Sequence, residues 1–263
     1  MVKAKKSLGQ HFLADPVVVS EIITALGPVA GETVVEIGSG QGVLTMPLVN
    51  SGADVVAVEL DRILAPQLAA AFAGRANVRV IEADILSFDP PQLGLTRFAL
   101  VGNLPYNITT PVMDWLLKYH DAVDRAVMMM QKEVAERVSS PPGKRARSTI
   151  SVLTELYYSS EIICTVPAHA FRPPPKVDSA VVKFVRHGRV YPLSNLARFE
   201  KLVRNCFRSK RKSLLNNLDV AYPIKRAELE EIVVRSCGSS HIRAEQLDLD
   251  TFVALANTIL SLT

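Results

Sequence analysis

The sequence contains little cysteine, and no metal-site spacing accompanies it. Cys164, Cys206 and Cys237 are its three cysteines and lie far apart along 263 residues. The chain has neither a Cys-x-x-Cys pair nor a His-x-x-x-His pair, and its five histidines are widely separated. Structural zinc sites use such closely spaced ligands. We therefore expect neither disulfide bonds nor a bound metal ion.

Long apolar runs are also missing. Met1 is followed by Lys3, Lys5 and Lys6 without an apolar signal segment, and no stretch reaches the ~20 apolar residues that span a bilayer. Internal repeats and low-complexity segments are absent. At 48% hydrophobic residues the chain can bury one large core and a smaller second one. We expect a cytoplasmic globular protein without membrane association.

Positive charge is concentrated in one part of the chain. The net charge is only +4, but Arg186–Arg226 carries +9 and the remainder sums to −5. Such asymmetry is typical of a protein with a polyanionic partner. A solvated basic face without a partner is an equally good interpretation of charge alone.

The first part of the chain alternates short apolar runs with helical patterns. The runs are continuous rather than alternating, which indicates strands buried on both faces of a parallel sheet with helices on each side. The predicted strands are Thr33–Ile37, Asp54–Val58, Val78–Ile81, Phe98–Val101 and Ala126–Met130. The predicted helices include Val17–Leu26, Leu64–Ala73 and Pro111–Tyr119.

The later part of the chain changes character near Gly188. Glu155–Val166 and Val177–Val185 flank the proline run Pro173–Pro175 and predict two more strands of the sheet. Beyond His187 the composition is helical and basic, with helices predicted at Leu196–Leu218, Arg226–Ser236 and Asp250–Leu260. We predict an α/β domain over 1–187 and a small all-α domain over 188–263.

A glycine-rich loop follows the first predicted strand of the sheet. Gly38, Gly40 and Gly42 follow the strand Thr33–Ile37, which contains the acidic residue Glu36. Glycines there allow a sharp turn and a close approach of a ligand to the main chain. The dinucleotide fingerprint spaces its glycines G-x-G-x-x-G, which is a different pattern. The spacing favours S-adenosyl-L-methionine over NAD as cofactor.

Polar residues stand at the ends of the next three predicted strands. Glu59 ends the second strand, where a carboxylate can accept hydrogen bonds from ribose hydroxyls. Asp84 follows the third strand, and its carboxylate can accept from the adenine amine of the cofactor. Asn103 follows the fourth. Any one of them taken singly is also explained as a helix cap or an exposed polar group.

The segment Asn103-Leu104-Pro105-Tyr106 suits chemistry on an adenine amine. That nitrogen is a poor nucleophile because its lone pair is delocalised into the ring. The carboxamide oxygen of Asn103 and the carbonyl of Leu104 can accept the amine hydrogens and orient the lone pair. Pro105 stiffens the loop, and Tyr106 offers a ring for stacking on the base; ordinary packing is the alternative role of Tyr106.

Three segments carry a resemblance to a known family: Leu8–Leu13, Asn103–Ile108 and Phe171–Ser179. With them, the chain closely resembles the bacterial KsgA-type ribosomal RNA adenine dimethyltransferases. The resemblance extends over nearly the whole chain, including Gln131–Ala135 and Arg243–Leu247. It implies a Rossmann-like class I methyltransferase fold.

The resemblance also implies residue roles and a substrate. Phe171 is expected to close the base pocket opposite Tyr106. The substrate of the family is a pair of adjacent adenosines in the 3′-terminal hairpin loop of small-subunit (16S) rRNA, each methylated twice, so we expect the small ribosomal subunit as partner. We also expect a monomeric enzyme. The implied cofactor-binding residues are His11, Leu13, Gly38, Gly40, Glu59, Asp84, Ile85 and Asn103.

The chain departs from the family pattern at one position and in one segment. His11 stands where bacterial relatives often have asparagine, although histidine also occurs in the wider family. Arg147-Ser148-Thr149 stands where the family usually has Tyr-Gly-Arg. Lys144, Arg145 and Arg147 are expected to keep that region basic.

The basic stretch contains a candidate RNA-binding face. If Leu196–Leu218 is one helix, the three- and four-residue spacing of its cations places most of them on one side. Such a stripe suits phosphate contacts without base recognition. The residues concerned are Arg204, Arg208, Lys210, Arg211 and Lys212.

Two other functions compete with this interpretation. The erythromycin-resistance methyltransferases share the fold and modify a large-subunit adenosine, but they usually have isoleucine in place of Leu104 and a less complete proline segment. A non-catalytic assembly or transcription factor on the same fold is the second alternative. The intact Gly38–Gly42 loop and the Asn103–Tyr106 segment argue against lost chemistry.

Overall fold

The computed structural model describes residue 5 and residues 9–262. It comprises two compact units, the first formed by the chain up to Ala135 together with Ser159–Arg186, the second by Glu136–Tyr158 and His187 onward. Lys3, Lys6 and Leu8, which belong to the basic start and to the first family segment, lie outside the described residues.

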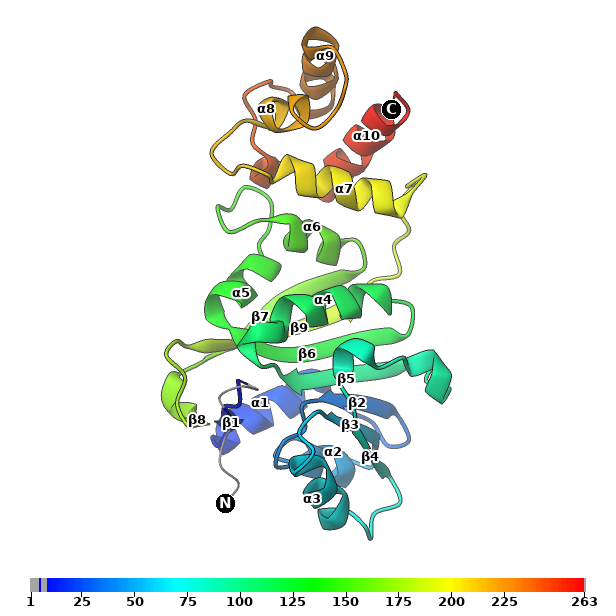
Figure 1. Ribbon diagram of the computed structural model, residues 1–263, viewed down its shortest axis with the longest axis vertical. Helices are drawn as coiled ribbons and strands as arrows, with labels where there is room; N and C mark the ends of the chain where they lie inside the picture. Colours follow the sequence, from blue (N-terminus) through cyan, green and yellow to red (C-terminus); the bar gives the residue numbers. More distant parts are fainter. Residues whose placement is uncertain (1–4, 6–8, 263) are drawn as a thin grey trace. The chain divides into compact units, whose positions relative to one another are not determined.

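The first unit is built on a mixed, mostly parallel sheet (Figure 1). Strands β4, β3, β2, β5 and β6 are parallel in that order, and β9 pairs antiparallel with β6, with β7 at the outer edge. This confirms the predicted α/β class. The strands are β2 (Thr33–Ile37), β3 (Asp54–Glu59), β4 (Val78–Glu82), β5 (Phe98–Asn103), β6 (Val123–Gln131), β7 (Tyr158–Val166) and β9 (Ser179–Arg186). A separate antiparallel pair joins β1 (Phe12–Leu13) to β8 (Phe171–Arg172).

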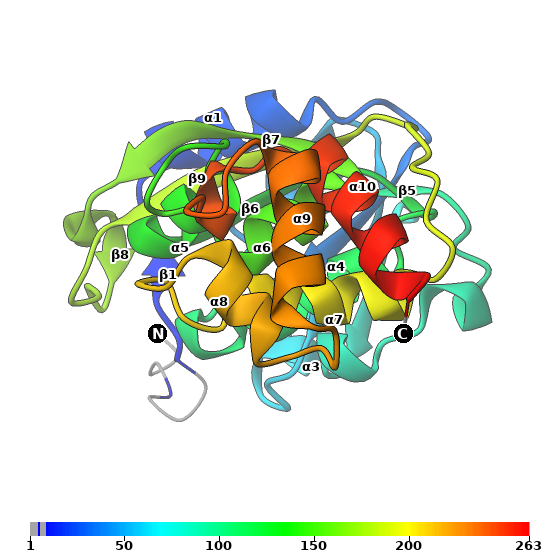
Figure 2. The same ribbon diagram turned by 90° about the horizontal axis from the view of Figure 1, so that it is seen from above.

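The inner strands β2 and β5 are buried on both faces of the sheet, which explains their continuous apolar runs. Val34 packs in one core cluster with Val18 and Ile22 of α1 (Pro16–Leu26), and its neighbour Val35 is equally buried on the other face. Helices α1 and α4 (Thr109–Lys118) lie on opposite sides of the sheet (Figures 1 and 2). The remaining helices of this unit include α2 (Thr45–Asn50), α3 (Leu64–Ala71) and the 3-10 turns η2 (Ile85–Ser87), η3 (Pro90–Leu93), η4 (Tyr106–Ile108) and η5 (Ala168–Ala170). Helix α5 (Lys132–Val138) follows β6.

The strand order determines where a ligand binds. From β2 the chain continues to β3 and β4 on one side, and β5 returns to the opposite side of β2. The order of the strands therefore reverses between β2 and β5. In open α/β sheets the crevice outside the carboxyl ends of the strands at such a reversal is the usual binding site. The Gly38 loop and Asn103 are placed at this point.

The second unit is helical, with a core that includes Phe199, Leu218, Ile232 and Phe252. Its helices are α6 (Thr149–Glu155), α7 (Leu196–Cys206), α8 (Leu214–Asp219), α9 (Arg226–Cys237) and α10 (Leu249–Leu260), with the 3-10 turn η6 (Ala244–Gln246). No helix within the described residues is long and apolar enough to cross a membrane.

The compact units differ from the predicted domains in one segment. The sequence predicted a division into 1–187 and 188–263, but Glu136–Tyr158 belongs to the helical unit. Arg147 shows why, because its guanidinium donates to Leu247 O (3.1 Å), Ser140 O (3.0 Å) and Glu155 Oε2 (2.7 Å). Its side chain is buried, so the expectation that Arg147 contributes to a basic surface was wrong. Lys144 and Arg145 are exposed.

Two predicted elements needed correction. The helix predicted over Leu196–Leu218 ends at Cys206, and α8 begins only at Leu214. The side chain of Asn217 explains the break, since its Nδ2 donates to Cys206 O (2.9 Å) and to Ser209 O (3.1 Å). These bonds satisfy carbonyls that a continuing helix would have used. The strand predicted from Glu155 starts at Tyr158, because Glu155 ends α6.

Candidate cofactor and substrate site

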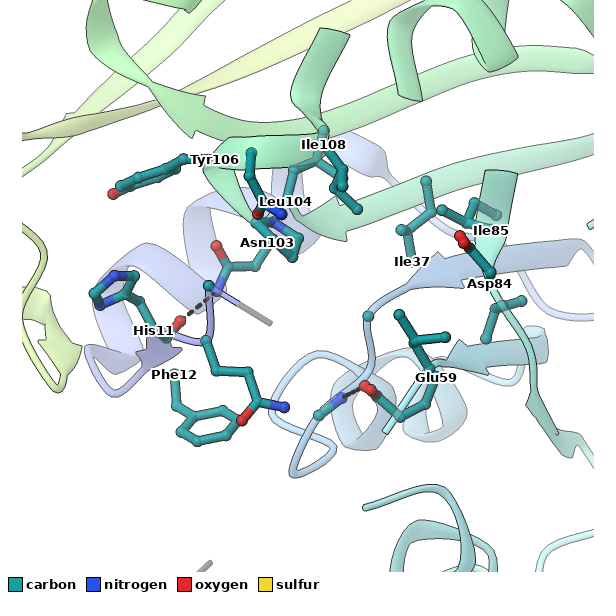
Figure 3. A pocket seen from close by; sticks show the side chains of 18 of the residues that line it. His11, Phe12, Ile37, Glu59, Asp84, Ile85, Asn103, Leu104, Tyr106 and Ile108 are labelled. Carbon is teal, nitrogen blue, oxygen red and sulfur yellow. Dashed lines mark hydrogen bonds between the residues drawn. The ribbon is translucent and has the colours of Figure 1, made fainter. Parts of the chain in front are cut away.

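A cavity opens at the carboxyl edge of the sheet of the first unit (Figure 3). It holds about 900 Å³ of space between atoms, its open mouth included. Its lining includes the predicted residues His11, Gly38, Gly40, Glu59, Asp84, Ile85, Asn103, Leu104, Pro105 and Tyr106.

The glycine loop requires glycine at Gly38 and Gly40. Their φ angles are +67° and +54°, in the left-handed region that side chains disfavour. A Cβ atom at Gly40 would also lie 3.4 Å from the Phe12 ring. The backbone of this loop is therefore free to face a ligand across the cavity.

Glu59 is buried at the end of β3 and its carboxylate is fixed by two backbone amides. Gly40 N donates to Oε2 at 2.7 Å and Asp61 N donates to Oε1 at 2.8 Å. A carboxylate offers about four acceptor positions, so each oxygen keeps one for a ligand. The loop after β2 and the loop after β3 thus orient one acceptor group toward the cavity (Figure 3).

Asp84 lies in the cavity wall and caps a helix at the same time. Its Oδ1 accepts from Leu86 N at 2.9 Å and begins η2. One carboxylate oxygen therefore has a local role, and Oδ2 has no hydrogen bond within the described residues. The following Ile85 is buried and contributes an apolar wall.

Asn103 ends β5 with its amide held in one orientation. Its Nδ2 donates to His11 O at 2.9 Å (Figure 3). Because this bond uses the donor end of the amide, Oδ1 remains as an acceptor at the cavity. The neighbouring Leu104 is anchored by its own N–H, which donates to Met129 O at 3.0 Å.

The structure brings together the described parts of the three family segments. Tyr106 Oη lies 2.8 Å from Ser179 Oγ, and His11 Nδ1 lies 2.8 Å from Pro173 O. The rings of His11 and Tyr106 stack with centroids 5.7 Å apart. Burial raises the pKa of Tyr106, so its hydroxyl stays protonated at neutral pH. Segments far apart in sequence thus form one wall.

Phe171 does not lie where the resemblance implied. It is 1% exposed and packs in the apolar core with Val18, Val166 and Val181. It is not part of the cavity wall, and the ring beside Tyr106 is that of His11. The cause is the pairing of β8 with β1, which places Phe171 opposite Leu13 and turns its side chain into the core.

Leu13 also lies outside the main cavity. It is buried and lines a smaller adjoining cavity whose wall also contains Gly38, Gly40 and Asn103. Its side chain is part of the same apolar core as Phe171. Leu13 can therefore contact the cofactor only through its backbone or within this adjoining cavity.

Several lining residues were not predicted. Phe12, Asn107 and Ile108 lie within the family segments, so their position in the sequence was an available signal. Leu60 follows Glu59 directly. Gln10 lines the cavity and also bonds to Asp61, a contact that no sequence pattern indicated.

Glu36 is buried beneath the glycine loop. Its Oε2 accepts from Thr45 Oγ1 at 2.6 Å. Burial raises the pKa of this carboxyl to about 7, against the lowering effect of the hydrogen bonds. Glu36 therefore supports the loop from below and does not line the main cavity.

The predicted RNA-binding residues lie in the second unit, mostly in a turn. Arg204 is on α7, whereas Arg208, Lys210, Arg211 and Lys212 are in the turn between α7 and α8, and all are exposed. We call residues 207–213 the basic turn. Its cations do not share one helix face as predicted, because the helix ends first.

The described part of the chain contains no cluster of three or more histidine, cysteine or carboxylate side chains that could hold a metal ion. Cys164, Cys206 and Cys237 are free thiols. The expected absence of a metal stays a prediction for metal analysis of the purified protein.

Comparison with known proteins gives the family. Residues 1–238 match the family model described as ribosomal RNA adenine dimethylase. The chain belongs to this family. Curated relatives named "Ribosomal RNA small subunit methyltransferase A" are similar over nearly their whole length. That of Acidobacterium capsulatum is 40% identical over 98% of this chain and 92% of its own, and that of Xanthomonas axonopodis pv. citri is 41% identical over 98% and 97%.

Solved structures show the same methyltransferase fold. A dimethyladenosine transferase from Plasmodium falciparum has a TM-score of 0.80 and 26% identity, covering 95% of this chain and 98% of its own. The 23S rRNA methyltransferase ErmE has a TM-score of 0.75 and 28% identity, covering 94% and 99%. Adenine dimethylases use a methyl donor of the S-adenosylmethionine type, and the observed cavity has the groups to hold one. It offers a glycine cradle, the buried Glu59 carboxylate and the apolar wall at Ile85.

Proposed function

We propose that this chain transfers methyl groups from S-adenosyl-L-methionine to the exocyclic N6 amines of two adjacent adenosines in the 3′-terminal hairpin loop of 16S rRNA, two to each amine. The observation that carries this proposal is the Asn103 amide, whose donor end is fixed by His11 O at 2.9 Å and whose oxygen remains at the cavity. The family resemblance supplies the choice of nucleotides.

The cofactor is proposed to lie along the carboxyl edge of the sheet. Gly38 and Gly40 admit it close to the main chain, Glu59 accepts from its ribose hydroxyls, and Asp84 accepts from its adenine amine. His11, Leu13, Ile85 and Asn103 complete the proposed contacts. When bound, the cofactor supplies a methyl group activated by a positively charged sulfur.

The protein's part in the reaction is orientation rather than strong-base catalysis. In the first transfer, Asn103 Oδ1 and the carbonyl of Leu104 accept the two hydrogens of the target amine. Each transfer releases one amine hydrogen as a proton to water, so in the second transfer one of these oxygens accepts the single hydrogen that remains. These bonds localise the nitrogen lone pair and direct it toward the methyl group. Pro105 stiffens the loop, and its carbonyl accepts from Ile108 N at 3.1 Å, which holds the loop closed.

The ring of Tyr106 is proposed to capture the flipped-out adenine. Its hydroxyl bond to Ser179 leaves the ring fixed in the cavity wall, and Ser179 is fully buried. Extracting a base costs a few kcal/mol in a duplex and less in a loop, and stacking on an aromatic ring offsets this.

The basic turn is proposed to bind rRNA phosphates, together with Arg204. Its cations are exposed and none forms an ion pair within the described residues, whereas Arg186, Arg189 and Arg226 each pair with a carboxylate. Exposed cations without partners suit contacts to the phosphates of the RNA backbone. Such contacts position the protein on the RNA but do not recognise its sequence. We place the reaction in the cytoplasm on the small ribosomal subunit, with a monomeric enzyme.

The proposal is tested by methyl transfer from labelled cofactor to purified subunits. We expect label in small subunits that lack the modification, at two adjacent adenosines near the 3′ end, and none in large subunits. Label in large subunits only would support the erythromycin-resistance type of reaction. Tight binding to small subunits without any transfer would support a non-catalytic assembly role.

A further inference from the structure

We propose that Asp61 is a positioning residue that holds the N-terminal segment Gly9–Phe12 closed over the cofactor cavity and at the same time orients Glu59. We call Lys5, Gln10 and Asp61 the N-terminal clasp. The inference rests on the proposed cofactor site and assigns a role to residues outside the ligand-binding set.

The clasp is centred on a buried carboxylate. Lys5 Nζ donates to Asp61 Oδ1 at 2.7 Å, and Gln10 Nε2 donates to Oδ2 at 3.0 Å. Asp61 is 1% exposed, whereas the side chain of Lys5 is 37% exposed. A third bond, from Ile63 N to Oδ1 at 2.9 Å, fixes the carboxylate to its own loop. The N-terminal segment is therefore tied to the end of β3 through both oxygens.

The two N-terminal residues also bind each other. Lys5 N donates to Gln10 Oε1 at 2.8 Å, and Gln10 N donates to Lys5 O at 3.4 Å. The amide of Gln10 is thus used at both ends, once by Lys5 and once by Asp61. This closed ring of bonds makes Lys5 and Gln10 act together.

The backbone of Asp61 extends the clasp to the cofactor site. Its N–H donates to Glu59 Oε1 at 2.8 Å, on the carboxylate that Gly40 N also holds. On the other side, the segment that the clasp holds supplies His11 O, which orients Asn103. Gly9, Gln10, His11 and Phe12 all line the cavity. Asp61 therefore supports both proposed acceptors, the Glu59 carboxylate through its backbone N–H and the Asn103 amide through the segment that its carboxylate holds.

Because the Asp61 carboxylate is buried, the clasp depends strongly on the ammonium group of Lys5. A buried carboxylate is costly unless it is paired and hydrogen-bonded. Burial alone would raise the pKa of Asp61, but the bonds from Lys5, the Ile63 amide and Gln10 outweigh it and lower the pKa to about 2. The clasp therefore stays charged at neutral pH. Removing the Lys5 ammonium leaves that charge with fewer partners and favours an open segment.

Lys5→Met tests the clasp without changing the core, because Lys5 is partly exposed and its stem is retained. Arg62→Met is the matched control: Arg62 is the cation next to Asp61, with a side chain 90% exposed and only a 3.7 Å approach to Glu82. Lys5→Arg restores the charge. The readouts are calorimetric affinity for S-adenosylmethionine, its dissociation rate by stopped flow, and hydrogen exchange of the Gln10 amide without ligand.

We expect Lys5→Met to weaken cofactor binding roughly tenfold, mostly through faster dissociation, since a charged hydrogen bond from a partly exposed donor is removed. Gln10 exchange should accelerate, Lys5→Arg should recover both, and Arg62→Met should match the wild type. Unchanged affinity and exchange in Lys5→Met, or equal effects in Arg62→Met, would overturn the proposal. If the wild type binds no cofactor, the proposed function fails, while the exchange rates still decide whether the clasp holds.

Discussion

The side-chain amide of Asn103 donates to the backbone carbonyl of His11 at 2.9 Å, across 92 residues of sequence. This bond joins the end of β5 to the N-terminal segment and determines which end of the amide faces the cavity. The Oδ1 atom has no hydrogen bond within the described residues, and it is the acceptor that chemistry on an adenine amine requires. The strand and the segment must both be in place before the site is complete.

Replacing Asn103 should affect turnover more than binding. Asn103→Ala removes the acceptor that acts as the methyl group is transferred, so we expect a loss of roughly 10²–10³-fold in kcat, as for other preorganised polar groups. Affinity for the small subunit should change little. Single-turnover methylation and filter binding measure the two quantities. Normal turnover in this variant would exclude the proposed role of the amide.

Replacing Glu59 should weaken cofactor binding directly. Glu59→Gln keeps the shape of the side chain but removes the charge-assisted contact, for an expected loss of about 1.5–3 kcal/mol in calorimetry. Glu82 ends the neighbouring strand β4 and does not line the cavity, so Glu82→Gln is the control and should bind normally. Equal affinities for the two variants would mean that the ribose is held elsewhere.

Tyr106 and Phe171 should behave differently, because only one lines the cavity. Tyr106→Ala should weaken capture of the base by about 1–3 kcal/mol. Phe171→Ala removes a fully buried ring and should lower the free energy of unfolding by about 3–5 kcal/mol. Thermal unfolding and RNA binding of both variants check this. A stable Phe171→Ala protein with impaired base capture would favour the role first implied by the resemblance.

The buried carboxyl of Glu36 should make stability depend on pH. Its pKa rises from 4.5 to about 7 on folding. Below about pH 4.5 the Glu36 carboxyl is protonated in both the folded and the unfolded state. Between pH 4.5 and about pH 7 it loses its proton only in the unfolded state. Folding stability therefore falls as pH rises to about 7 and then levels off. Relative to the wild type, Glu36→Gln should gain stability on the order of 3 kcal/mol between pH 5 and pH 8. A constant difference in denaturant unfolding across this range would contradict it.

The basic turn should determine how RNA affinity depends on salt. Removing one cation that binds a phosphate flattens the plot of log affinity against log salt by nearly one unit. Substituting glutamine at Arg208, Arg211 and Lys212 together should lower both affinity for the small subunit and the salt slope. Cofactor binding should persist, since that cavity lies in the first unit. The control is Arg235→Gln, an exposed cation on α9. A wild-type slope in the triple variant would leave the turn as a solvated surface.

The sequence alone determined the fold class and most strand positions. The run Thr33–Ile37 predicted strand β2 as observed, because a strand buried on both faces needs apolar residues without alternation. The sequence also placed Gly38, Glu59, Asp84 and Asn103 around one cavity. This succeeded because parallel strands end at the same edge of a sheet, so position in sequence translates directly into position in space.

Tertiary contacts decided what local patterns left open. The α7 helix stops at Cys206 because Asn217, eleven residues later, binds its carbonyl, and helical spacing carries no sign of such a bond. Arg147 looked like part of a basic surface, but acceptors at Ser140, Glu155 and Leu247 bury it. In each case the deciding partner is distant in sequence, and its distance and direction arise only when the chain folds.

The same reason separates Phe171 and Asp61 from the predicted site. The motif around Phe171 indicated that the segment matters, but the pairing of β8 with β1 directed the ring into the core. Asp61 was an acidic residue two positions after Glu59, and only folding brought Lys5 and Gln10 to its oxygens. Sequence spacing fixes which residues share an edge of the sheet. Which way each side chain points, and which charge is buried with which partner, depends on packing between segments that the spacing does not relate.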